Sequence, residues 1–129
     1  MRLVRILNSS RPQTEPIIAQ YCESYFEKLR GLMFRRHLLE NHGLLLVYRH
    51  DSRVNTAIHM LGMRMDITTV WINLAGKVVD VCLAQRWRLS YFPQSPASYV
   101  LEAHPARYMD FRVGDQIQIV ELQFTQGKV

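Results

Sequence analysis

The sequence has little cysteine and no long hydrophobic run, and each shortage excludes a class of protein. Its 129 residues include two cysteines, Cys22 and Cys82, which are too few for a disulfide framework. The longest apolar runs, 44–48 and 67–72, fall far short of the about 20 residues that a membrane-spanning helix needs. The amino-terminal residues lack the apolar core and cleavage site of a secretion signal. We therefore expect a soluble, cytoplasmic protein with no membrane span.

Familiar motifs of nucleotide, metal and catalytic chemistry are also missing. The sequence has no Walker lysine loop, no dinucleotide-binding glycine fingerprint and no Cys-x-x-Cys pair. Neither cysteine lies in a cationic motif that would activate a nucleophile, and no spacing brings two carboxylates together. No zinc-ligand spacing is found among His37, His42, His50 and His104. We therefore expect no metal or cofactor, and we do not expect an enzyme.

The charge of the chain is positive and comes mainly from arginine. Sixteen cations stand against eleven anions, which gives a formal net charge of +5. Lysine is scarce: Lys28, Lys77 and Lys128 are the only lysines, and the other cations are arginine. The arginine guanidinium suits bidentate recognition of carboxylate or phosphate groups. This balance permits an anionic partner without identifying one.

Most apolar residues repeat with the two-residue period of β-strands. A hairpin is predicted where 70–72 leads through Asn73–Lys77 into 78–83, because Gly76 can supply the positive φ of such a turn. Residues 49–53 are polar and predict a solvated connection, and 85–97 predicts a long irregular loop. The pattern predicts six or seven short strands in all, including 2–7, 44–48, 98–103 and 116–124.

One segment repeats with the helical period instead. Its apolar residues follow one another at offsets of four, seven, eight and eleven, namely Ile18, Cys22, Tyr25, Phe26 and Leu29. We predict a helix with its body at Gln20 to Leu29, capped by Thr14 or Ser24. In the alternative, Pro16 to Gln20 stays extended and the helix begins near Cys22. The fold class is then α+β: a single domain over 1–129 with a mainly antiparallel, barrel-like or rolled sheet and one packed helix.

Four segments in a fixed order carry a resemblance to a known family. They are Arg30–Arg35 (RGLMFR), Gly43–Leu46, Ile58–Arg64 (IHMLGMR), and Val100–Glu102 with Gly114–Asp115. Together these segments resemble the domain of unknown function family numbered 192, a set of small prokaryotic proteins, over roughly residues 18 to 120. The resemblance implies a compact β-rich fold with one helix that bears the Arg-Gly-Leu-Met segment. It implies no established activity.

A group of charged, aromatic and imidazole side chains suggests a site for a small polar or anionic ligand. A planar cation, an aromatic platform and a carboxylate can fix such a ligand with a few directed hydrogen bonds. The candidates are His59, Arg64, Trp87, Arg88, Tyr91 and Glu102. We expect this site where the 85–97 loop meets His59 and Arg64. In the alternative interpretation, Arg64 pairs with Glu102 and Trp87 covers the end of the barrel.

Two further hypotheses concern metal and nucleic acid. Thioethers and an imidazole suit Cu(I), but in an extended segment Met60 would point away from His59, Met63 and Met65, so core packing is the favoured role.

Single-stranded nucleic acid is the alternative partner, because arginines alternate with aromatic rings that can stack on bases. That surface would comprise Arg30, Arg35, Arg36, Arg86, Arg88, Trp87, Tyr91 and Phe92. The chain is thus predicted to be a binding or accessory module.

Overall fold

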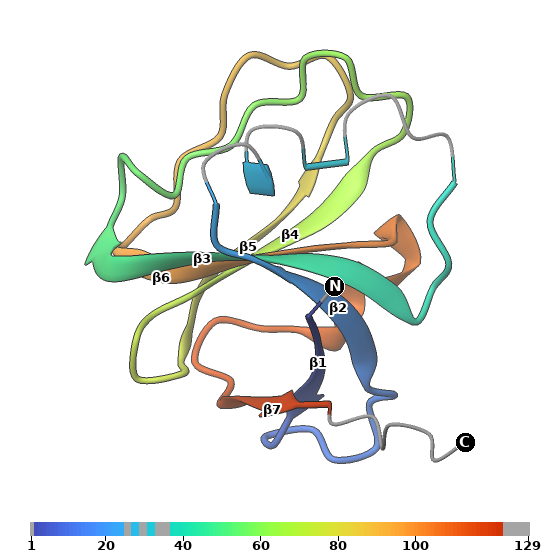
Figure 1. Ribbon diagram of the computed structural model, residues 1–129, viewed down its shortest axis with the longest axis vertical. Coiled ribbons are helices and arrows are strands. Elements are labelled where there is room, and N and C mark those ends of the chain that lie inside the picture. The colour runs from blue at the N-terminus through green and yellow to red at the C-terminus, as the bar shows by residue number, and fades with distance from the viewer. Residues whose placement is uncertain (1, 25–26, 29–30, 33–36, 123–129) are drawn as a thin grey trace.

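The computed structural model describes residues 2–24, 27–28, 31–32 and 37–122. One seven-stranded sheet forms the body of the molecule, with the strand order β5-β4-β6-β3-β2-β1-β7 (Figure 1). Neighbouring strands are antiparallel except β2 and β3, which are parallel. The strands are β1 (Leu3–Asn8), β2 (Ile17–Cys22), β3 (His42–Ser52), β4 (Ile67–Ile72), β5 (Val78–Ala84), β6 (Ala97–Ala103) and β7 (Ile117–Glu121).

Most of the predicted strands are confirmed, and the hairpin is the clearest case. β4 and β5 pair antiparallel, and Gly76 in their connection has a φ of 87°. β3 is longer than predicted, so the expectation of a solvated connection over 49–53 is wrong. Its backbone pairs with β6 up to Val47 and again at Ser52, across a register shift between them, while Arg49 and His50 stay exposed. A polar side chain does not end a strand when the backbone has a partner.

The predicted helix is wrong over its first residues, because Gln20 to Cys22 belong to β2. β2 is paired on both sides, with β1 and β3, and this pairing overrides the helical period of the sequence. A helical turn begins after Ser24 instead. The Glu27 amide donates to Ser24 Oγ (3.1 Å) and the Ser24 amide donates to the Glu27 carboxylate (3.2 Å), which is a capping box. Tyr25, Phe26 and Leu29 lie outside the described residues.

A second short helical element, η1 (Pro105–Asp110), is a 3-10 helix that sequence periodicity did not indicate. The His104 ring nitrogen Nδ1 accepts a hydrogen bond from the Ala106 amide (3.0 Å) and so caps it. The buried Arg107 side chain donates to the Asp110 carboxylate and to the backbone oxygens of Glu15 and Glu40. Arg107 thereby ties η1 to the segments that precede β2 and β3.

The sheet is mixed and open, so the barrel-like closure that we predicted is not observed. β5 and β7 are its edge strands. They approach each other only near their beginnings, where the Val78 amide donates to the Asp115 oxygen (2.9 Å) and the Ile117 amide donates to the Gly76 oxygen (2.7 Å). Over the rest of their described lengths, β5 and β7 are not paired with each other. Among the described residues, no helix has the length and apolar character needed to cross a membrane.

Two hydrophobic clusters occupy the two faces of the sheet. The first includes Leu101 and Ala103, and the second includes Val100 of the same strand. Because side chains alternate along a strand, Glu102 faces the second cluster. That cluster is covered by Leu32 and Leu38 of the connection from β2 to β3, which we call the crossover (residues 23–41, described at 23–24, 27–28, 31–32 and 37–41), and by the loops 53–66 and 85–96, seen above the sheet in Figure 1. The functional side chains therefore belong to this second face.

Candidate functional site

A pocket of about 500 Å³ lies on the second face of the sheet, between β3, β4 and β6 on one side and the crossover and the 53–66 loop on the other. Its walls are mainly apolar, and its polar groups come from only a few positions. The residues that line it are Glu23, Lys28, Gly31, Leu32, Leu46, Tyr48, Asn55, Ala57, Ile58, His59, Met60, Met63, Ile67 and Glu102. This combination of apolar walls and few polar groups is typical of small-molecule sites.

Glu102 is the buried charged group of the pocket. Only 6% of the residue is exposed, and among the described residues its carboxylate has no hydrogen-bond or ion-pair partner. Burial raises the pKa of Glu102 to about 7, because the ionised form loses its hydration. Its cross-strand neighbour on β4, Thr69, also has a buried hydroxyl without a partner. Buried polar groups without partners are rare in proteins and point to a site.

The crossover passes directly over the Glu102 carboxylate. Gly31 has a φ of 46°, and its amide donates to the Glu27 oxygen (3.0 Å), so it follows the helical turn. A Cβ atom at Gly31 would lie 3.4 Å from Glu102 Oε1. The side-chain-free backbone at this position therefore leaves the space above the carboxylate open. Glycine is favoured here for its positive φ, whereas an added Cβ would make an ordinary van der Waals contact with the carboxylate oxygen.

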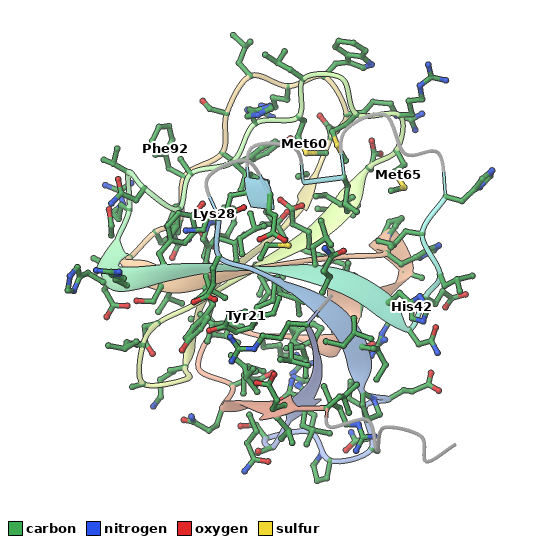
Figure 2. The ribbon with its side chains drawn as sticks, viewed as in Figure 1. Tyr21, Lys28, His42, Met60, Met65 and Phe92 are labelled. Atoms are coloured by element: carbon green, nitrogen blue, oxygen red, sulfur yellow. The ribbon has the colours of Figure 1, made fainter. Side chains whose placement is uncertain are left out.

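Lys28 and Tyr48 form one wall of the pocket. The Lys28 ammonium lies 3.9 Å from the centroid of the Tyr48 ring, which is a cation–π contact. Burial lowers the pKa of Lys28. Burial, and secondarily the charge of Glu102, raises the pKa of Tyr48 to about 12. Tyr48 thus lies within electrostatic reach of Glu102, and Figure 2 shows Lys28 on the same side of the sheet as Met60.

His59 contributes a buried ring nitrogen, Nδ1, that has no hydrogen-bond partner. Both Met60 and Met63 line the pocket with it, so the prediction that Met60 points away from the other side chains is wrong. The segment is not extended. Gly62 has a φ of 76° and the Met63 amide donates to the Met60 oxygen (3.2 Å), which turns the chain and brings both methionines inward. Met65 does not line the pocket.

The structure divides the six predicted site residues between two places. His59 and Glu102 line the pocket, whereas Arg64 is exposed and forms no ion pair with Glu102 in the described structure. The other three predicted residues belong to the 85–97 loop, and 60% of Trp87 is exposed rather than packed as a cover.

The 85–97 loop lies beside the segment that contains His59. The Met60 amide donates to the Arg88 oxygen (2.9 Å), and the Trp87 amide donates to the Met60 oxygen (2.8 Å). Arg88 in turn lies over the Tyr91 ring, 5.1 Å from its centroid. These residues therefore support the loop that forms the pocket wall from outside, and they do not themselves enter the pocket.

Sequence reasoning missed Lys28, Tyr48 and Asn55 as lining residues. Tyr48 carried a usable signal, because it follows Leu44 and Leu46 at the two-residue spacing of one strand face. Lys28 and Asn55 carried none, since the crossover and a loop bring them to the pocket. In the described part of the chain, no group of three or more His, Cys, Asp and Glu residues is arranged to hold a metal ion.

Fold and site together define the class: a β-rich protein whose open mixed sheet carries a pocket beneath a parallel crossover. Residues 6–119 match the DUF192 family, described as uncharacterized ACR, and the chain belongs to that family. Each of the four segments that carried the resemblance contributes to the pocket lining, through Gly31 and Leu32, through Leu46, through Ile58, His59, Met60 and Met63, and through Glu102, whereas Gly114 and Asp115 do not line it.

Relatives of known sequence or structure carry no assigned activity that extends to this chain. A UPF0127 protein from Thermococcus gammatolerans is 32% identical over 114 residues, which cover 87% of this chain and 72% of that protein. The crystal structure of a candidate transcription regulator from Sinorhizobium meliloti has a TM-score of 0.78 and 19% identity, over 92% of each chain. A protein of unknown function from Novosphingobium aromaticivorans has a TM-score of 0.74 and 17% identity, over 90% of this chain and 83% of that one. At these identities, the two structures establish the fold alone.

Proposed function

We propose that this protein is a small-molecule-binding module whose site is the pocket above Glu102. The observation that carries the proposal is a carboxylate that is buried, has no partner among the described residues and opens into a pocket of about 500 Å³. Desolvating such a group costs free energy, and a ligand that hydrogen-bonds to it recovers part of that cost. The ligand would place one polar group at Glu102 and an apolar part against the surrounding side chains.

The shape and lining of the pocket support this function. Its volume lies within the range of roughly 300 to 1,000 Å³ that is common for small-molecule sites. Leu32 of the crossover and Ile58 and Met63 of the 53–66 loop offer apolar surface, and Asn55 adds an amide at the wall. Because the crossover leaves the space over the carboxylate open at Gly31, a ligand group can reach Glu102.

A fragment screen by ligand-observed NMR tests the proposal. We expect a set of small polar fragments to bind the wild-type protein and to lose binding in Ala57→Trp, since an indole at this wall position would fill the pocket. Ala106→Trp is the matched control, because Ala106 is exposed on η1 and does not line the pocket. Fragments that bind equally well to Ala57→Trp would refute the pocket as the site.

A second function, binding of single-stranded nucleic acid, is favoured by one observation at Trp87. This residue has a φ of 67°, a conformation that non-glycine residues rarely adopt, and it holds its indole exposed between Arg86 and Arg88. Exposed indole and guanidinium groups suit stacking on unpaired bases. Part of this surface is already engaged, because Arg86 lies 3.1 Å from the Asp66 carboxylate. Arg30, Arg35 and Arg36, predicted for the same surface, lie outside the described residues.

Fluorescence anisotropy with a labelled oligonucleotide tests this second function. Nucleic-acid binding requires an affinity that falls steeply as salt increases, and it requires a loss of affinity in Trp87→Ala. Ligand binding in the pocket should survive both changes, because Trp87 does not line the pocket. Anisotropy that does not change at low salt would remove the nucleic-acid function and leave the pocket untouched.

A further inference from the structure

The charged residues that line the pocket are mainly acidic, whereas the chain as a whole carries a net positive charge. The protein has 13 arginines among its 16 cations, yet no described arginine lines the pocket. The charged lining residues are Glu23, Lys28 and Glu102. Glu23 is exposed at the rim, and its carboxylate lies 3.5 Å from the Arg2 guanidinium, so it is already paired. Among the described lining residues, the charges without an ion-pair partner are therefore the carboxylate of Glu102 and the ammonium of Lys28.

Lys28 does not neutralise this carboxylate. Its ammonium lies over the Tyr48 ring, and the described residues include no ion pair between Lys28 and Glu102. This contact shows that the aromatic wall accepts an ammonium group. Nδ1 of His59, which is buried and has no hydrogen-bond partner among the described residues, accepts a hydrogen bond when the ring proton is on Nε2. The described residues therefore offer a carboxylate and an imidazole nitrogen in the pocket, and no described positive group is in contact with Glu102.

We propose that the group held at Glu102 is a compact organic ammonium ion, of the size of a primary alkylamine, with its alkyl part against the apolar wall. This inference rests on the proposed function, because it names the ligand class of the same pocket. An ammonium carries three donors and no acceptor, which complements a partnerless carboxylate. An anionic group at the same position would meet the like charge of Glu102 in a poorly solvated interior. The anionic ligand expected from the arginine-rich sequence is therefore disfavoured here.

Protonation of Glu102 should oppose the ammonium ion. In the described part of the chain, the titratable groups that line the pocket with Glu102 are Lys28 and Glu23 on the crossover, Tyr48 on β3 and His59 on the 53–66 loop. Since the pKa of Glu102 is about 7 in the free protein, the ionised fraction falls between pH 8 and pH 6. A ligand that requires the ionised form should then bind about tenfold more weakly at pH 6 than at pH 8.

The experiment is a titration with three probes of similar size, followed by the amide signals of Gly31 and His59 in two-dimensional NMR spectra. The probes are n-butylammonium, 1-butanol and butyrate, each titrated at pH 8 and pH 6. We expect n-butylammonium to bind with a Kd on the order of millimolar, as its size allows, and at least tenfold more tightly than 1-butanol. In Glu102→Gln this preference should disappear, whereas the control Glu40→Gln, at an exposed residue outside the pocket, should keep it.

The outcomes separate the ligand class from the function. If 1-butanol or butyrate shifts the pocket amides at the same or lower concentration than n-butylammonium, the ammonium inference is wrong and the binding function stands. If n-butylammonium binds equally well to Glu102→Gln, the inference is also wrong. If neither these probes nor the fragment set shifts the pocket amides, both proposals fail. The dispersion of the Glu102→Gln spectrum verifies that the variant is folded.

Discussion

The buried carboxylate of Glu102 makes the stability of the protein depend on pH in an unusual direction. Folding usually stabilises the ionised form of a carboxyl group and lowers its pKa, but burial raises the pKa of Glu102 from 4.5 to about 7. The folded state therefore binds the proton more tightly than the unfolded state does. By linkage, the stability is complete below pH 4.5 and is lost progressively as the pH rises through 7. Replacing Glu102 with glutamine removes this loss, because the amide does not ionise.

The size of the effect follows from the two pKa values. Each tenfold difference in proton affinity between the folded and unfolded states corresponds to about 1.4 kcal/mol. For Glu102, the ionised form should therefore destabilise the folded state by about 3 kcal/mol once the pH is well above 7. Between pH 5 and pH 8, the difference in unfolding free energy between Glu102→Gln and the wild type should shift by about 2 to 3 kcal/mol in favour of the variant.

Urea denaturation of both proteins at several values between pH 5 and pH 8 measures this difference. Other titrating groups act equally on both proteins and cancel in the comparison. Glu40→Gln is the control, because this carboxyl is exposed and its loss should leave the difference from the wild type constant across the pH range. A free-energy difference between Glu102→Gln and the wild type that does not change with pH would refute the reasoning, since Glu102 would then be solvated or paired.

Four other changes test separate features. Gly43→Ala should destabilise the protein by about 2 to 4 kcal/mol in thermal denaturation, because the added Cβ would lie 2.6 Å from a backbone oxygen of β6. Arg107→Met should cost about 3 kcal/mol in urea denaturation, since it leaves a carboxylate and two backbone oxygens without their donor. Trp87→Gly should not lower the melting temperature in calorimetry, because glycine adopts a φ of 67° without strain. Burial raises the pKa of Cys82 to about 11, so iodoacetamide should modify it at pH 8 roughly a hundredfold more slowly than a thiol with a pKa of 9. Unchanged stability of Gly43→Ala or of Arg107→Met would contradict the packing arguments. A lower melting temperature of Trp87→Gly, or a faster reaction of Cys82 with iodoacetamide, would contradict the other two.

The parts of the fold that local chemistry determines could be predicted from the sequence. The β4–β5 hairpin depends on the turn around Gly76, whose positive φ is a property of a few neighbouring residues. The Ser24 cap is another local feature, although its helical turn begins later than the predicted helix body. The identity of Ile17–Cys22 as a strand could not be predicted in this way. It depends on pairing with β1 and β3, which are distant in sequence and leave no local signature.

The candidate site was predictable to the extent that its chemistry was unusual. His59 and Glu102 were identified because an imidazole and a lone carboxylate stand out in apolar segments, and both line the pocket. Arg64 and Trp87 attracted attention for the same reason, but they face the solvent. The turn at Gly62 brings Met60 and Met63 to the pocket, whereas Leu61 and Arg64 of the same segment are exposed. Such a turn is not visible in residue spacing alone.

The parallel pairing of β2 and β3 has a consequence for how proteins of this kind can diverge. Two parallel neighbours require the chain to return along the full length of a strand, so the crossover must span the face that holds the pocket. The crossover and the 53–66 loop together form the roof of the cavity, and the sheet forms its floor. Exchanging both stretches for those of a relative should transplant ligand preference while the underlying scaffold is inherited unchanged.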